Sequence, residues 1–405
     1  MELGGTQRKL QKLSKEFVVH CRKDISKKCV LFPKLVLQSL NVWPDNDDMI
    51  KRWLMVVVIV SLNLMCFAHI AYLAINVTDI SKMTSACTTV VVVIETIAKL
   101  MTMMMYKKPL NAILTSIWLD FWPSKVASKY RQKQIQNRSR YVITVGVTFL
   151  VMAFFSNAQF MAFPIVANTD QLPLASWYPF NFKSTPQYQL MYIWQWFMNQ
   201  VVISTLSGFD AFFNSLVMIC STQFQILQDV LENLCCERGW KQRAGIAQMG
   251  RRDSEMVNLI TCVEHHLLLL EICALLEKIF SHIVFLQFVV STLAMCVSCV
   301  ALIADPSLWQ HMLSYLIAHV FQFFIYCSVG NELTYQSGQI ADAAYYCDWH
   351  LSQDIDFRKG LMLMIQRAQK PVSLTVSGRM QLSYANFIAT VHLSFSFYTL
   401  LNTFV

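Results

Sequence analysis

The stretch from Trp53 to Ile75 reads WLMVVVIVSLNLMCFAHIAYLAI, and it contains no Asp, Glu, Lys or Arg. A helix needs about 20 predominantly apolar residues to cross the hydrocarbon core of a bilayer, because its backbone must satisfy its own hydrogen bonds there. This stretch meets that length without a charge. It predicts a membrane-spanning helix, and it sets the expected fold class as an all-α membrane protein.

Further along the chain, six more stretches have the same character, so we predict a polytopic protein with seven transmembrane helices. Only 14% of the 405 residues are charged and 55% are hydrophobic, against about 25% charged residues in an ordinary soluble domain. The fourth stretch keeps an apolar period beyond its span, to Leu227, which predicts a helix that continues past the bilayer. The predicted spans are 53–75, 83–105, 141–166, 188–221, 280–303, 308–330 and 381–405.

The basic residues set the expected orientation. With the N-terminus in the cytosol, the inner segments hold 30 of the 33 Lys and Arg residues, whereas the outer loops hold only Lys82 and Lys183. This excess on one side predicts an inside N-terminus without a signal peptide and, with seven spans, an outside C-terminus. The topology is the reverse of a G-protein-coupled receptor. The net charge of +8 then indicates attraction to anionic lipid, and we expect no nucleic-acid partner.

No pattern for catalysis is present in the sequence. There is no Gly-rich phosphate loop, no nucleophile elbow and no His-Glu-x-x-His zinc motif. The neighbours His265 and His266 would point about 100° apart on a helix, so they cannot share a metal ion without a third ligand. We therefore expect no enzyme, no cofactor and no metal site.

Charged residues inside the predicted spans are the first candidates for function. Glu95 and Lys99 stand four residues apart in the second span, so they can pair on one helix face, with Lys99 near enough to the inner boundary to reach water. Asp210 lies at the inner end of the fourth span, and we expect its partner in the inner helices. Ion handling by the pair and a proton relay through Asp210 are the functional alternatives.

The last span has one polar face. At 100° per residue, its small polar positions fall within an arc of about 80°. Such a stripe either packs against neighbouring helices through hydroxyl hydrogen bonds or lines water, and the sequence alone favours packing. Several subunits that each contribute one such helix around an axis could build a pore. The stripe consists of Ala385, Ala389, His392, Ser396, Thr399 and Thr403.

Leu40-Asn41-Val42-Trp43-Pro44 lies before the first predicted span, and Trp177-Tyr178-Pro179-Phe180 lies in the second predicted outer loop. Both resemble stretches that insect odorant receptors have at these places, and further motifs similar to that family follow in its order. The segment before the last span carries the strongest match, with Asn331-Glu332, Ala341 to Trp349, Lys370-Pro371, Leu374-Thr375 and Gly378. The last span adds Ser394 to Leu401, although the family more often has Tyr-Phe where this chain has Phe397-Tyr398 and Lys-Phe-Phe near Arg379-Met380.

The resemblance implies a subunit of a ligand-gated, non-selective cation channel in the plasma membrane. In this family a divergent odorant-binding subunit forms a heterotetramer with a shared coreceptor. This chain resembles the divergent subunit, because the coreceptor has a longer loop between the fourth and fifth spans. The expected partners are the coreceptor, a small volatile odorant, the lipid bilayer and permeant cations. Subunit contacts would lie at 223–282 and 331–369.

The resemblance also assigns a gate and a ligand pocket. The gate would be an apolar ring near the outer end of the last helix, where Leu400 matches, although Leu400 lies about 60° from the centre of the polar stripe. Ser396, Phe397 and Thr403 are its expected neighbours. The pocket would lie in the outer half of spans two, three, four and six. Its expected residues are Cys87, Val91, Met152, Phe155, Ser156, Gln159, Phe160, Tyr192, Trp194, Phe197, Met198, Val201, Tyr315, His319 and Phe323.

Two other functions remain open at this point. A gustatory-type receptor channel shares the inside N-terminus but would assemble without the coreceptor. A small-molecule transporter usually shows repeats or broken helices, which are not evident here. The expected organisation is 1–52 as a cytosolic segment with a helix beside the membrane, 53–221 as spans one to four, 222–279 as a cytosolic extension, 280–330 as spans five and six, 331–380 as cytosolic connecting helices and 381–405 as the pore-lining span.

Overall fold

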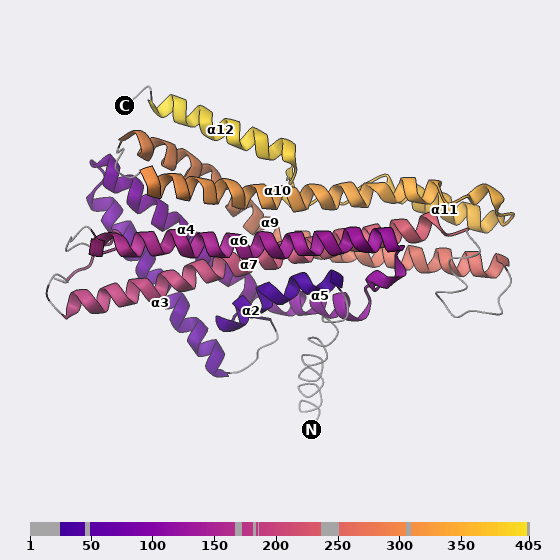
Figure 1. Cartoon of the computed structure of the whole chain (residues 1–405), viewed down its shortest axis with the longest axis horizontal. Helices are drawn as coiled ribbons and strands as arrows, with labels where there is room; N and C mark the ends of the chain where they lie inside the picture. Colours follow the sequence, from indigo (N-terminus) through magenta and orange to yellow (C-terminus); the bar gives the residue numbers. More distant parts are fainter. Residues whose placement is uncertain are drawn as a thin grey trace.

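The computed structural model of the chain describes residues 25–44, 49–166, 172–180, 184, 186–235, 251–304 and 309–402. This part is a bundle of long helices that run mostly along one axis, with α3 inclined across it (Figure 1). The elements of the first half are η1 Ile25–Val30, α2 Leu31–Ser39, α3 Met49–Ile75, α4 Ile80–Met105, α5 Lys107–Leu119, η2 Ser124–Val126, α6 Lys129–Val166 and α7 Gln187–Glu232. The second half contains α9 Arg251–Ala304, α10 Trp309–Tyr345, η4 Trp349–Leu351, α11 Ile355–Ala368, β1 Thr375–Val376, β2 Met380–Gln381 and α12 Tyr384–Asn402.

Six of the described helices are long and apolar enough to cross a membrane, namely α3, α4, α6, α7, α9 and α10. They correspond to the first six predicted spans, and the all-α membrane class is confirmed. The described part of α12, which corresponds to the seventh, has 19 residues and is not among these six. Seven crossings and the positions of the two termini therefore stay predictions.

The helices are longer than the spans that hydropathy indicated. α7 continues past Asp210 to Glu232, as the apolar period predicted. α9 has 54 residues and α10 has 37, so at 1.5 Å per residue they extend over about 81 Å and about 56 Å, well beyond one crossing. The C-terminal end of α10 leads through η4 into α11 at the right of Figure 1, and α11 packs against both α9 and α10. The spans predicted at 280–303 and 308–330 are only the apolar parts of these helices.

α7 is the central helix of the bundle. Every residue from Ser207 to Leu231 is buried, and the helix packs against α2, α6, α9 and α10. Gly208 allows the close approach of α2, because a Cβ atom there would lie 2.9 Å from Cγ1 of Val36. Burial on all sides is typical of a helix in the interior of a large bundle.

A short hairpin leads into α12. β1 and β2 pair antiparallel, and the turn between them has positive φ at Ser377 and at Gly378, a conformation that glycine adopts without strain. Glu277 of α9 holds the hairpin by accepting hydrogen bonds from the backbone N–H of Thr375, at 2.9 Å, and from its hydroxyl. Because residues 380 and 381 belong to the hairpin, α12 begins at Tyr384, three residues later than predicted.

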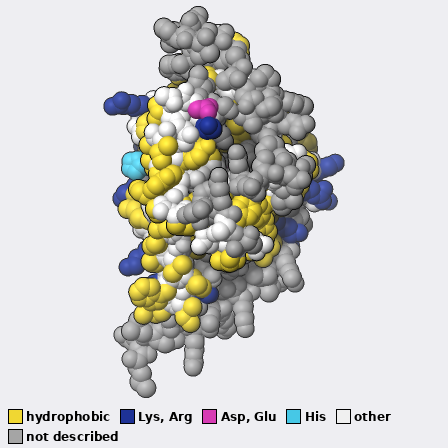
Figure 2. Space-filling model, turned by 90° about the vertical axis from the view of Figure 1, so that its left-hand side faces the viewer, with side chains coloured by type: hydrophobic (Ala, Val, Ile, Leu, Met, Phe, Trp, Pro, Cys, Tyr) yellow, Lys and Arg dark blue, Asp and Glu magenta, His cyan; other side chains and the backbone are white. Residues whose placement is uncertain are grey.

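The end of the bundle at which α6 ends and α7 begins is largely apolar. Figure 2 shows this end, where hydrophobic side chains cover much of the described surface and most of the charged ones lie at its edges. Along α3, large apolar side chains point outward, and Trp53, Leu64 and Phe67 are 68%, 62% and 67% exposed. Such a surface is typical of contact with lipid or with another membrane subunit.

Candidate functional site

A cavity of about 570 Å³ lies between α4, α6, α7 and α10, toward the end of the bundle shown in Figure 2. Met65 of α3 and Leu174 of the segment 172–180 complete its wall. Apolar side chains dominate the lining, and none of the described lining residues is Asp, Glu, Lys or Arg. A cavity of this size and composition suits a small, mostly apolar ligand.

The segment 172–180 is fixed over the cavity by hydrogen bonds to two helices. The backbone N–H of Trp177 donates to the carbonyl of Ala68 at 3.0 Å, and Nδ1 of His69 lies 2.7 Å from the carbonyl oxygen of Ala175. From α7, the Gln195 amide oxygen accepts from the N–H of Leu174 at 3.1 Å. The motif that contains Trp177 therefore has a structural role, which its sequence did not show: its backbone hydrogen bond holds the segment whose Leu174 completes the cavity wall.

The structure brings a part of the predicted pocket residues to this cavity. On α6 and α10 the expected face lines it, with Met152, Phe155, Ser156, Gln159, Tyr315 and His319. Phe160 belongs to α6, but its side chain lies outside the described part of the structure.

On α4 and α7 the expected faces are displaced from the cavity. Cys87 and Val91 do not line it, whereas Thr88, Thr89, Val92 and Val93, rotated by about 100°, do. Lining from α7 comes from Asn199, Val202, Ile203 and Leu206. The expected α7 residues lie elsewhere: Met198 and Val201 are buried in the core, Trp194 packs against it, Phe197 is 56% exposed, and the Tyr192 hydroxyl donates to the carbonyl of Met161.

Phe323 also lies away from the cavity. Its ring packs against Phe288 of α9 at 6.0 Å and Phe387 of α12 at 5.9 Å between centroids. The residues next to it on α10 lie in two different environments. Phe321 and Gln322 line the cavity, whereas Phe324 contacts Tyr384 and Phe387 of α12. One turn of α10 thus joins the cavity to α12.

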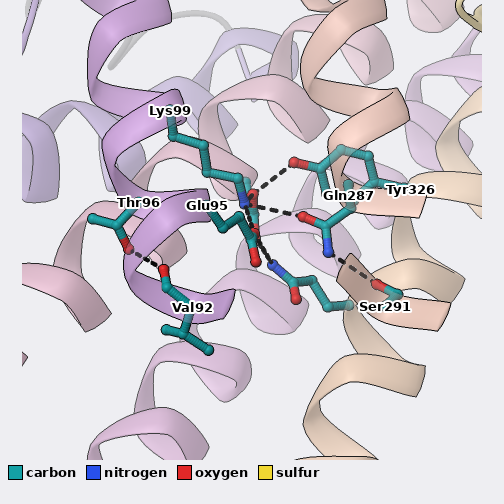
Figure 3. A network of polar contacts seen from close by, with 9 residues as sticks. Val92, Glu95, Thr96, Lys99, Gln287, Ser291 and Tyr326 are labelled. Carbon is teal, nitrogen blue, oxygen red and sulfur yellow. Dashed lines mark hydrogen bonds and ion pairs between the residues drawn. The ribbon is translucent and has the colours of Figure 1, made fainter. Parts of the chain in front are cut away.

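A buried charge cluster adjoins the cavity (Figure 3). Nζ of Lys99 lies 2.6 Å from Oε1 of Glu95 and 2.5 Å from Oδ1 of Asp210, and it donates to Oε1 of Gln287 at 3.1 Å. The predicted pairing of Glu95 with Lys99 is confirmed. The expectation that Lys99 reaches water is wrong, because its side chain is 0% exposed. Gln287 in turn donates to the Ser291 hydroxyl at 3.0 Å.

Asp210 has its partners in other spans, not in the inner helices as predicted. Besides Lys99 of α4, it accepts from the Tyr326 hydroxyl at 2.6 Å and from Nε2 of Gln322 at 2.6 Å, both on α10. Gln322 also donates to Oε1 of Glu95 at 3.2 Å and lines the cavity. The cavity wall and the charge cluster therefore share one side chain, and the cluster ties α4, α7, α9 and α10 together.

The polar stripe of α12 faces away from the chain's own bundle. Its described members Ala385, Ala389, His392, Ser396 and Thr399 are all exposed, whereas Thr390 and Ser394 are buried. The Ser396 and Thr399 hydroxyls donate to carbonyls of their own helix, at 3.0 and 2.8 Å. The described stripe residues therefore do not pack against helices of their own chain, and packing against another subunit and the lining of water both stay predictions. Thr403 and the side chains of Phe397 and Leu400 lie outside the described part of the structure.

The comparisons with known proteins agree with this architecture. The family model for the 7tm odorant receptor matches residues 76–395. The chain therefore belongs to the 7tm odorant receptor family. Among its relatives, Odorant receptor 82a of Drosophila melanogaster is 26% identical over 363 residues, which cover 82% of this chain and 87% of the relative. Odorant receptor 10 of Aedes albopictus is 25% identical over 287 residues, covering 68% and 72%.

The fold also matches a solved structure. The insect olfactory receptor OR5 from Machilis hrabei, in complex with eugenol, has a TM-score of 0.81 to this chain at 15% identity, with 96% of this chain and 99% of that chain covered. A second structure of this receptor also has a TM-score of 0.81, at 15% identity, with 95% of this chain and 98% of that chain covered. This likeness identifies the fold of the bundle.

Proposed function

We propose that this protein is the odorant-binding subunit of a ligand-gated, non-selective cation channel in the plasma membrane, assembled as a heterotetramer with the coreceptor. The observation that carries the proposal is the cavity of about 570 Å³ without charged lining among the described residues, in a chain of the odorant receptor family. The Machilis hrabei receptor was solved in complex with eugenol, which is a small and mostly apolar molecule. A small volatile odorant in the cavity opens the channel.

The exposed face of α12 supports a pore built by several subunits. A stripe of small polar residues that the chain leaves uncovered is available to face an assembly axis. Ligand binding shifts the equilibrium toward an open state only if the ligand binds that state more tightly. The α10 turn from Phe321 to Phe324 provides the physical path, because it contacts both the cavity and α12.

Alanine at Phe155 tests the cavity as the odorant site. Phe155 lines the cavity, so its loss should change the ranking of odorants and raise the half-maximal concentration of a cognate odorant by roughly tenfold. The measurement is a voltage-clamp dose–response series. Phe154→Ala is the matched control, because Phe154 is the preceding residue of α6 and is not among the lining residues. Equal shifts in the two variants, or altered ion permeation with an unchanged ranking, would place the site elsewhere.

Alanine at Leu400 tests the proposed gate. If apolar rings at this position hold the closed pore dry, the smaller side chain should raise the ligand-free current several-fold in cells that also express the coreceptor. Basal and evoked currents are recorded together with surface labelling. Unchanged currents at equal surface abundance would remove Leu400 from the gate.

Recording with and without the coreceptor separates the proposal from its alternatives. Odorant-evoked single-channel current steps that require both chains would support the assignment of this protein as the odorant-binding subunit. Steps from this chain alone would favour a gustatory-type channel, and saturable uptake without steps would favour a transporter.

A further inference from the structure

We infer that the cavity selects uncharged molecules that carry an oxygen function, and that this oxygen forms a hydrogen bond with His319. The inference rests on the proposed function, since it names the chemical class of the ligand for the same cavity. It adds a specificity-determining contact to a site whose lining is otherwise mostly apolar.

His319 has the geometry of a ligand contact. It lines the cavity from α10, it is only 6% exposed, and its Nδ1 atom is buried without a hydrogen-bond partner among the described residues. The ring of Tyr315 lies edge-on against the imidazole at 4.4 Å between centroids, which fixes the ring plane. A buried polar atom without a partner is unfavourable, so a group that supplies the missing hydrogen bond gains the corresponding free energy.

Several other polar side chains of the lining already have partners. The Thr89 hydroxyl donates to the carbonyl of Ala86 at 2.8 Å, and the Asn157 and Asn199 amides bond to each other. Gln322 is engaged by Asp210 and Glu95. A ligand would have to break these contacts to use them, whereas Nδ1 of His319 has no hydrogen bond to break. Ser156 and Gln159 are half-buried, so a hydrogen bond to either of them gains less than one to a buried atom without a partner. Among the described lining residues, the directed contact therefore falls on His319.

The lining also determines the charge of the ligand. None of the described lining residues is acidic or basic, so an ionised ligand would lose its hydration without meeting an opposite charge in the wall. An imidazole nitrogen donates in one tautomer and accepts in the other. A carbonyl, ester or ether oxygen can accept from it, and a hydroxyl can do either. Neutral alcohols, phenols, ketones, aldehydes and esters form this class, and pure hydrocarbons do not.

Matched pairs of volatiles test the inference directly. Each comparison sets a hydrocarbon against oxygenated molecules with the same carbon skeleton: octane against 1-octanol and against 2-octanone, limonene against carvone, and propylbenzene against 4-propylphenol. Octanoate and octylamine serve as the ionised probes. With the coreceptor present, the oxygenated members that evoke current should do so at concentrations roughly tenfold or more below those of their hydrocarbon partners. The ionised probes should be weaker than 1-octanol.

Two substitutions then assign the preference to His319. His319→Phe keeps a ring against Tyr315 and removes both nitrogens, so the oxygenated and hydrocarbon members should become nearly equipotent while the response to the hydrocarbon is retained. His319→Gln restores a hydrogen-bonding group and should recover a part of the preference. If His319→Phe fails to reach the surface, His319→Gln and the pair ratios of the unmodified protein still decide.

The outcomes separate this inference from the proposed function. Equipotent pairs in the unmodified protein, or a preference that survives His319→Phe, would overturn the inference and leave an odorant-gated channel intact. A complex that reaches the surface and shows no current to any volatile in the panel would contradict the proposed function itself. A preference of at least about tenfold that disappears with His319→Phe establishes the contact.

Discussion

Replacing Lys99 with methionine should nearly abolish the protein at the cell surface. The change leaves the carboxyl groups of Glu95 and Asp210 buried beside an apolar side chain, after both have lost their cationic partner at 2.6 and 2.5 Å. Removal of one partner from a buried ion pair destabilises proteins by about 3–5 kcal/mol, a large part of a total stability of about 5–15 kcal/mol. Surface labelling and the melting temperature of the purified complex measure the loss.

The same helix offers a matched control. Lys82 pairs with Asp79 at 2.9 Å, but both side chains are largely exposed, so Lys82→Met should change surface abundance little. A second variant tests the cause. Adding Asp210→Asn to Lys99→Met removes one of the uncompensated carboxylates and should recover a part of the stability. Normal abundance of Lys99→Met would show that the cluster is not ionised as its geometry indicates.

The cluster lies where hydropathy predicts hydrocarbon, and this position explains its composition. One cation there faces two carboxylates, and amide and hydroxyl groups of Gln287, Gln322 and Tyr326 fill further hydrogen-bonding positions. Charged groups at membrane depth are tolerated when they face the bundle interior and pair with each other. Because its members come from four helices, the cluster favours a single arrangement of α4, α7, α9 and α10.

Helices could be predicted from the sequence far better than the faces they present. Apolar length alone locates a span, because a bilayer requires it. To predict which side of a helix faces a cavity, the sequence must show a contrast between polar and apolar positions. α4 has little contrast around Cys87, where two threonines are followed by four valines. A rotation by one residue was therefore invisible, and Thr88 and Val92 line the cavity where Cys87 and Val91 were expected.

Contacts between residues that are distant in the chain were the second feature that could not be predicted from the sequence. Lys99 and Asp210 are 111 residues apart, and no local pattern indicates that they meet. Gln322 left a usable signal, since it is a polar side chain within an apolar span, where such residues often have a function. The exposure of the α12 stripe could not be predicted from the sequence, because small polar residues have the same spacing whether they pack against a neighbouring helix or face water.

Alanine should have opposite effects at two glycines of α10. A Cβ atom at Gly330 would lie 2.4 Å from Cβ and 3.0 Å from the carbonyl oxygen of Leu382. Leu382 is 2% exposed, and its N–H is held by the carbonyl of Leu374 at 2.9 Å, so the hairpin and the start of α12 must move. We expect Gly330→Ala to destabilise the complex by about 1–3 kcal/mol, despite the better helix propensity of alanine.

Gly338 is the matched position, because the nearest atom to its added Cβ is Cβ of Pro371 at 3.7 Å, an ordinary contact. Alanine there should stabilise by about 0.5–1 kcal/mol, through the smaller loss of backbone entropy. Melting temperatures of both variants measure the two signs, and voltage clamp shows whether Gly330→Ala also changes ligand-free current, as displacement of α12 requires. Two equal increases in melting temperature would mean that α10 and the segment leading into α12 are not in contact, and the proposed path from the cavity to α12 would then lose its support.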